Sequence, residues 1–169
     1  MEKTLPTILI DSREQSPLVF ENLPSVRATL PVGDYGLRNF SDWENPAFIV
    51  ERKSLPDLCH SLGKDRERFL REVKKMRGFR FRALVIEGTQ DMIELKQYRS
   101  LISPAAILST LDALSVRAGL HVFWCGDAEG AARKVESLAL MFVRGIQKDY
   151  WRLTASAVLE GEEQKGAAA

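Results

Sequence analysis

The stretch FIVERKSLPDL, Phe48 to Leu58, places three charged residues directly after three apolar ones. The apolar residues predict a buried strand, and side chains alternate across a strand, so Glu51 and Lys53 share one face while Arg52 points to the other. A carboxylate beside an ammonium can hold a hard cation and can orient or activate a neighbouring water. The competing interpretation is a surface ion pair worth less than about 1 kcal/mol.

Other acids also follow apolar segments. Asp11 comes directly after ILI, and Glu87 ends the apolar segment ALVIE. Asp34 follows Gly33 at an expected sharp turn, where the absence of a side chain allows the carboxylate to be aimed. Two such charges about 4 Å apart repel by about 4 kcal/mol at an effective dielectric near 20, so a cluster needs a proton or a divalent cation. Without His or thiolate ligands, Mg²⁺ or Mn²⁺ is the expected cation.

Several of these acids have a simpler structural explanation. Asp57 has the spacing of the acid in a capping box, SLPD. Asp11 could accept from the backbone of its own turn or pair with Arg13, and Glu87 could cap a helix that begins shortly after it. Glu14 lies in a turn with no strand to aim it. Asp34 of the Gly-Asp turn and Glu51 of the Glu-Arg-Lys triplet are the acids that such structural roles explain least well.

Basic residues are concentrated in one part of the chain. Residues 52–82 contain eleven Lys or Arg against four Asp or Glu, a net charge of +7, whereas the whole chain carries only +1. This asymmetry is typical of a basic face that contacts phosphates on a mildly acidic body. A solvated helix face with ion pairs such as Glu67–Arg71 explains the same pattern equally well.

The order of the expected elements predicts an α/β domain with a central mixed sheet covered by helices on both faces. Strands are expected at residues 7–10, 26–30, 35–37, 48–53, 82–88 and 120–125. Helices are expected from Ser54, over 64–76, from near 91, and over 104–118 and 128–146. We expect one folded domain over residues 1–149. Residues 150–169 form a C-terminal extension whose last ten residues are expected to be disordered.

Composition narrows the class of protein further. At 169 residues, 45% hydrophobic and 28% charged, the chain is ordinary for a globular domain. No apolar run approaches the ~18 residues of a membrane span, and the N-terminus lacks a signal-peptide pattern. The expected location is therefore the cytoplasm or nucleoid of a prokaryote or virus, or the nucleus of a eukaryote. Two isolated cysteines predict neither a disulfide nor a zinc site. The absence of a GxxxxGK[ST] loop argues against a nucleotide-dependent enzyme.

Taken together, VGDYGL…FIVERKSLPDLCHSL resembles the signature of the XPF-type structure-specific DNA endonucleases. In that family a Gly-Asp pair precedes a strand ending in Glu-Arg-Lys, with an Asp four residues beyond the Lys. ILIDSRE resembles the first-strand motif of the family, and ALVIEG a later strand. The resemblance covers about residues 8–146. It implies a restriction-endonuclease-like fold that cuts one strand of branched or flap DNA near single-strand/double-strand junctions with Mg²⁺ or Mn²⁺.

The resemblance also implies roles for individual residues. Asp34 and Glu51 would be metal ligands, and Asp11 would support the metal directly or through water. Lys53 would orient or activate the attacking water, whereas Arg52 would brace the site or hold a phosphate. The implied catalytic set is Asp11, Asp34, Glu51, Arg52, Lys53 and Asp57.

Contacts to DNA are expected from the basic helix, at Arg66, Arg68, Arg71 and Lys74. The family usually has a Gln after its helix Arg, but Leu70 or a neighbour occupies that position here. We recognise no helicase domain before Ile8 and no helix-hairpin-helix domain after Ile146, so we expect a stand-alone nuclease module or part of a larger protein. A second copy of the chain or a separate DNA-binding partner would then supply further affinity. The alternative function is a catalytically silent nuclease-fold subunit that binds DNA or scaffolds a repair or recombination complex.

Overall fold

The computed structural model describes residues 5–166, with the side chains of residues 5–154. Six strands form one mixed sheet in the order β2-β1-β3-β4-β5-β6, which confirms the expected α/β fold. The strands are β1 (Ile8–Asp11), β2 (Ser25–Ala28), β3 (Tyr35–Leu37), β4 (Phe48–Ser54), β5 (Phe81–Glu87) and β6 (His121–Trp124).

Strand direction brings several distant residues to one edge of the sheet. β3 is antiparallel to both of its neighbours, β1 and β4, and β5 is parallel to β4. β1, β4 and β5 therefore run in the same direction, and their carboxyl ends meet at the same edge. The amino end of β3 lies at that edge too, because β3 runs the opposite way.

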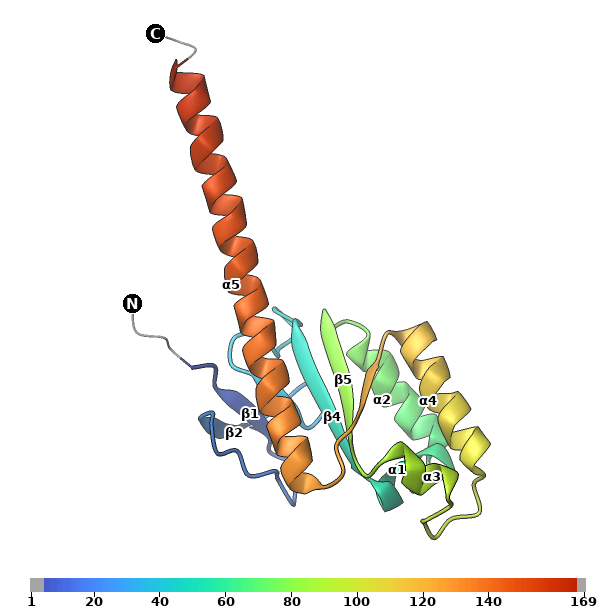
Figure 1. Ribbon diagram of the computed structural model, residues 1–169. Helices are drawn as coiled ribbons and strands as arrows, with labels where there is room; N and C mark the ends of the chain where they lie inside the picture. Colours follow the sequence, from blue (N-terminus) through green and yellow to red (C-terminus); the bar gives the residue numbers. More distant parts are fainter. Residues whose placement is uncertain (1–4, 167–169) are drawn as a thin grey trace.

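Helices cover both faces of the sheet, as expected (Figure 1). One face carries α1 (Leu55–Leu62), α2 (Arg66–Met76), α3 (Gln90–Glu94) and α4 (Pro104–Ala118), and the other carries α5 (Ala128–Gly166). Ile49 and Leu84 pack into the core under α1–α4, whereas Val50 and Val85 pack into the core under α5. This alternation assigns Glu51 and Lys53 to the α1–α4 face of β4, and Arg52 to the α5 face.

The final helix is longer than its sequence predicts. α5 has 39 residues and projects away from the body of the protein (Figure 1). The expected end near Ile146 is wrong, because the following segment contains no proline and many good helix formers. Residues 160–166, expected to be disordered, are also helical, and residues 167–169 lie outside the described part. Within the described residues, no helix is long and apolar enough to cross a membrane.

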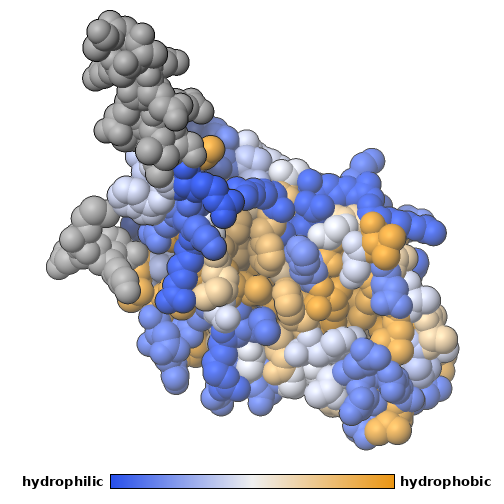
Figure 2. Space-filling view, turned by 45° about the horizontal axis from the view of Figure 1, so that its top comes forward, coloured by the Kyte–Doolittle hydropathy of each residue, from blue (hydrophilic) through white to orange (hydrophobic). Residues whose placement is uncertain are grey.

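The apolar segment around α4 and β6 is mainly core. Leu114, Ala118 and Leu120 are buried, while Val116 is exposed on α4. The side chains of β6 pack only partly, with Phe123 against the core under α5. Figure 2 shows hydrophobic surface between α5 and the helices of the opposite face, on a surface that is otherwise largely hydrophilic.

Candidate active site

Asp34 is held between two strands by its own backbone. Its N–H donates to the carbonyl of Val50 at 2.9 Å, and its carbonyl accepts from the N–H of Asp11 at 2.8 Å. These bonds extend the ladders of β3 toward β4 and β1. The carboxylate therefore lies beside the end of the apolar part of β4, where Glu51 begins the charged triplet.

Gly33 makes this placement possible. Its φ of +75° lies in the left-handed region, and a Cβ at this position would meet Cγ1 of Ile49 at 2.8 Å and the carbonyl oxygen of Val50 at 3.0 Å. No other residue fits this close approach without displacing β4. The turn expected from the Gly-Asp pair is therefore present.

Asp34, Glu51 and Lys53 form a charged group that is largely removed from water. Nζ of Lys53 donates to Oε1 of Glu51 at 2.5 Å, and Glu51 is only 6% exposed. Burial and the negative charge of Glu51 raise the pKa of Asp34 to about 7. Burial also raises the pKa of Glu51, although Lys53 opposes this shift. The two carboxylates thus repel each other in a site that lacks enough positive charge.

Each of these carboxylates keeps one oxygen without a protein donor. Asp34 accepts from the N–H of Arg52 at 2.7 Å through Oδ2 alone, and Glu51 accepts from Lys53 through Oε1 alone. Among the described residues, every fully buried side-chain oxygen or nitrogen has a partner. Oδ1 of Asp34 and Oε2 of Glu51 therefore reach solvent. Both residues line a cleft of about 540 Å³.

These two residues fit a hard divalent cation. No group of three His, Cys, Asp or Glu side chains within the described residues is arranged to hold a metal. Mg²⁺ keeps several waters and is usually bound by one or two carboxylates together with substrate phosphates. Two partly unsatisfied carboxylates with raised pKa values provide that kind of incomplete ligand set.

Asp11 lines the same cleft, but its oxygens are already occupied. Oδ1 accepts from the backbone N–H and Nε of Arg13, and Oδ2 accepts from Nη2 of Arg13 and the N–H of Leu30. Burial raises the pKa of Asp11, but these hydrogen bonds outweigh it and the pKa is lowered. A cation would have to displace these donors, so the geometry favours a supporting role over direct coordination.

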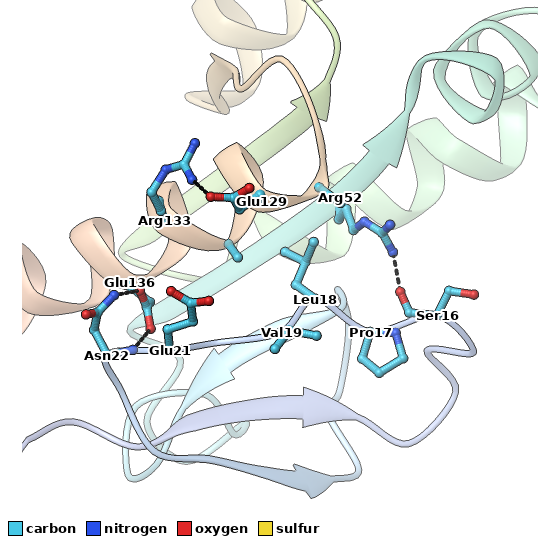
Figure 3. A pocket seen from close by; sticks show the side chains of 12 residues that line it. Ser16, Pro17, Leu18, Val19, Glu21, Asn22, Arg52, Glu129, Arg133 and Glu136 are labelled. Atoms are coloured by element: carbon cyan, nitrogen blue, oxygen red, sulfur yellow. Dashed lines mark hydrogen bonds and ion pairs between the residues drawn. The ribbon is translucent and has the colours of Figure 1, made fainter.

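Arg52 points away from the cleft and joins three parts of the chain. Nε pairs with Glu87 at the end of β5, and Nη1 lies 3.6 Å from Oε2 of Glu14. Nη1 also donates to the carbonyl of Ser16 at 2.7 Å, as Figure 3 shows beside a cavity that reaches the start of α5. Arg52 thus braces the edge of the sheet from the α5 side. Glu87 serves this brace and does not cap α3, where Thr89 is the N-cap.

Asp57 takes part in the cap of α1 and also lines the cleft. Ser54 caps α1 and accepts from the N–H of Asp57 at 3.2 Å, and its hydroxyl donates to Oδ2 of Asp57 at 2.6 Å. The same carboxylate is exposed at the rim of the cleft. It lies one helical turn beyond the charged triplet, on the α2 side.

The basic helix presents a different set of residues to the site than expected. Arg68, Glu72 and Lys75 line the cleft, at the i, i+4, i+7 spacing of one helix face. Glu72 and Lys75 are absent from the expected site. That spacing was visible in the sequence, but only the packing of α2 shows which face meets the sheet edge.

The other expected DNA contacts lie elsewhere on α2. Nη1 of Arg66 donates to the hydroxyl of Thr110 on α4 at 3.1 Å. Arg71 lies 3.9 Å from exposed Glu67, and Lys74 is exposed. The structure therefore brings only Arg68, of the four predicted residues, to the cleft.

A comparison with protein families matches residues 10–138 to the ERCC4 domain. The chain belongs to the ERCC4 domain family. The XPF-type family indicated by the Gly-Asp and Glu-Arg-Lys motifs is thereby confirmed. The comparison with curated proteins gives no match.

Solved structures share the fold. XPF from Aeropyrum pernix in complex with DNA superposes with a TM-score of 0.63 at 23% identity, over 83% of this chain and 66% of that chain. XPF from Aeropyrum pernix without DNA gives the same TM-score and identity, over 79% of this chain and 65% of that chain. This chain thus spans slightly less than two thirds of those structures, and the likeness supports the fold.

Proposed function

We propose that the chain is a divalent-metal-dependent endonuclease that hydrolyses phosphodiester bonds in branched or flap DNA near single-strand/double-strand junctions. One observation carries this proposal: Asp34 and Glu51 meet at one sheet edge, each with an oxygen open to a cleft that also contains Lys53. Membership of the ERCC4 domain family supports it.

Asp34 and Glu51 would hold Mg²⁺ or Mn²⁺, and Asp11 would keep the surrounding loops in place. When bound there, such a cation would supply a water of lowered pKa and positive charge against the scissile phosphate. Nζ of Lys53 is a hydrogen-bond donor beside Glu51, and the neighbouring carboxylates outweigh burial and raise its pKa. Lys53 is therefore a protonated donor that orients the attacking water and stabilises negative charge on the phosphate.

Arg68 and Lys75 would contact phosphates beside the cleft, which positions DNA without reading its sequence. XPF from Aeropyrum pernix forms a complex with DNA, and this supports DNA as the partner. We propose that a second copy of the chain, or a separate DNA-binding partner, supplies additional affinity for junctions. Sedimentation with and without a labelled flap substrate measures that stoichiometry.

Cleavage assays test the proposed activity. Labelled flap, fork, splayed-arm and blunt duplex DNA are incubated with Mg²⁺, Mn²⁺ or EDTA. Asp34→Asn and Lys53→Met should each lower the rate at least about 100-fold, whereas Asp112→Asn, exposed on α4, should cleave like the wild type. Cuts near the branch that need the metal support the proposal. DNA binding without cleavage under every condition would instead indicate a silent nuclease-fold subunit.

A further inference from the structure

A second, larger hollow adjoins the cleft at Asp57. It measures about 1190 Å³ and lies between α1 and the loop that joins α3 to α4. Asp57 lines both hollows, so a strand that passes over the cleft can continue into this groove without leaving the surface. Five residues that line the groove are important here: Asp57, Lys64, Tyr98, Arg99 and Leu101.

Two cations in the groove are available to a ligand. Lys64 and Arg99 are exposed, and neither forms an ion pair or a side-chain hydrogen bond with any described residue. Two other basic side chains on this side of the molecule are already paired: Nη2 of Arg68 lies 3.5 Å from Oδ2 of Asp65, and Nη1 of Arg71 lies 3.9 Å from Oε2 of Glu67. Phosphates can therefore bind at Lys64 and Arg99 without breaking an existing interaction.

Apolar and aromatic side chains accompany these cations. The hydroxyl of Tyr98 donates to the carbonyl of Ile102 at 2.8 Å, which holds the ring within the loop. Leu101 is fully exposed at 101%, which is unusual for a leucine in a folded domain. Basic side chains interleaved with an aromatic ring and exposed apolar surface are typical of sites for unpaired nucleic acid, whose bases stack while its phosphates bind cations. The bases of a duplex are paired and stacked on one another, so a duplex can contact such a surface only through its phosphates.

We propose that this groove binds the single-stranded arm of the branched substrate, with Lys64 and Arg99 on its phosphates and Tyr98 and Leu101 against its bases. This inference rests on the proposed function and names the part of the substrate that lies beyond Asp57. The six residues from Asp57 to the end of α1 at Leu62 extend about 8 Å, which spans about two to three stacked nucleotides. The duplex part of the substrate would contact Arg68 and Lys75, which line the cleft and not the groove.

Binding without metal tests the groove separately from cleavage. Fluorescence anisotropy in EDTA measures the affinity of a labelled ten-nucleotide oligothymidine and of a blunt hairpin duplex across a salt series. The variant Lys64→Ala/Arg99→Ala is compared with Arg144→Ala/Lys148→Ala, which removes two exposed cations from α5 on the other face of the sheet. Both variants change only exposed side chains and carry the same net charge.

Loss of two phosphate contacts lowers the slope of log K against log salt concentration by about 1.4 for single strands. The ratio of wild-type to variant affinity should therefore be about 25 times larger at 0.1 M salt than at 1 M salt. We expect this loss for the groove variant on oligothymidine, with less than about twofold change on the duplex. Leu101→Ser should weaken oligothymidine alone and leave the salt slope unchanged. Equal weakening on both ligands, or equal effects of the groove and α5 variants, overturns the inference.

The same variants separate this inference from the proposed activity. If the wild type binds oligothymidine through the groove but never cleaves DNA with metal, the proposed activity fails while the groove remains. If the wild type cleaves flaps and the groove variant binds and cleaves like the wild type, the groove assignment is wrong while the activity remains.

Discussion

Asp34→Asn should stabilise the metal-free protein, although it removes a residue proposed to be essential for catalysis. Burial and the charge of Glu51 raise the pKa of Asp34 to about 7, so the ionised carboxylate is held in a site that disfavours it. Asparagine is nearly the same shape, and its oxygen can still accept from the N–H of Arg52. The substitution therefore removes the charge and keeps the hydrogen bond.

The sign of the effect follows from proton linkage. A carboxyl group whose pKa is raised in the folded state stabilises the fold below its ordinary value of 3.8, and that stability is lost as pH rises through about 7. The difference between 3.8 and about 7 corresponds to roughly 4 kcal/mol at full effect. Relaxation and partial exposure of Asp34 reduce it, so we expect about 2 kcal/mol, or about 4–8 °C in Tm, at pH 8.

Thermal unfolding in EDTA at pH 5 and at pH 8, followed by circular dichroism, measures this difference. The gain of Asp34→Asn over the wild type should be clearly smaller at pH 5 than at pH 8, because at pH 5 the wild type has lost only the part of this stability that disappears between pH 3.8 and pH 5. Added Mg²⁺ should raise the Tm of the wild type more than that of the variant, because a cation relieves the same repulsion. Asp112→Asn on α4 is the matched control and should show no pH-dependent gain.

Two results would refute this reasoning. If Asp34→Asn has the same Tm as the wild type at pH 8 without metal, burial and the charge of Glu51 do not disfavour the ionised carboxylate of Asp34 in the folded protein. If the variant gains equally at pH 5 and pH 8, its effect does not come from the ionised carboxylate.

Three further substitutions test parts of the fold that support the site. Gly33→Ala should cost about 2–3 kcal/mol in urea unfolding and abolish cleavage, because its Cβ would meet β4 at a φ of +75°; wild-type stability would contradict the turn geometry. Arg13→Ala should lower the free energy of unfolding by about 1 kcal/mol at pH 7 and move acid unfolding to higher pH. Ionised Asp11 stabilises the fold above its ordinary pKa of 3.8, and this stability is lost as pH falls through its lowered folded pKa. An unchanged midpoint of acid unfolding, measured by circular dichroism, would count against this role of Arg13. Glu136→Ala should cost about 2–3 kcal/mol by chemical denaturation, since Glu136 is buried and accepts from three N–H groups of the loop after β1, whereas exposed Glu129→Ala should cost under about 1 kcal/mol.

Local chemistry made much of the site predictable. The alternation in FIVERKS assigns Glu51 and Arg52 to opposite faces of one strand, and the structure agrees because a strand has no other way to arrange successive side chains. Gly33 was expected to aim Asp34, and the close approach of β4 leaves no room for another residue there. Ser54 caps its helix as its spacing predicts. Each of these features depends on residues only a few positions apart.

The extent of α5 was also a local question, but the sequence pattern was a poor guide to it. An amphipathic pattern marks only the part of a helix whose apolar face packs against the rest of the protein. α5 continues for twenty residues beyond Ile146, where the sequence pattern placed its end. Its helix propensity does not depend on the sheet, so the end of the stripe does not mark the end of the helix.

The sequence by itself therefore determined which side chains could do chemistry and which way each points from its own strand or turn. Only the tertiary structure decided which of them meet. Arg52 pairs with Glu87, thirty-five positions away, Arg13 occupies the oxygens of Asp11, and Glu72 and Lys75 take the place beside the cleft that was expected for Arg66 and Lys74. These partnerships depend on how β1, β4, β5 and α2 pack against one another. The position of one element relative to another is set by the whole core, and no short stretch of sequence contains it.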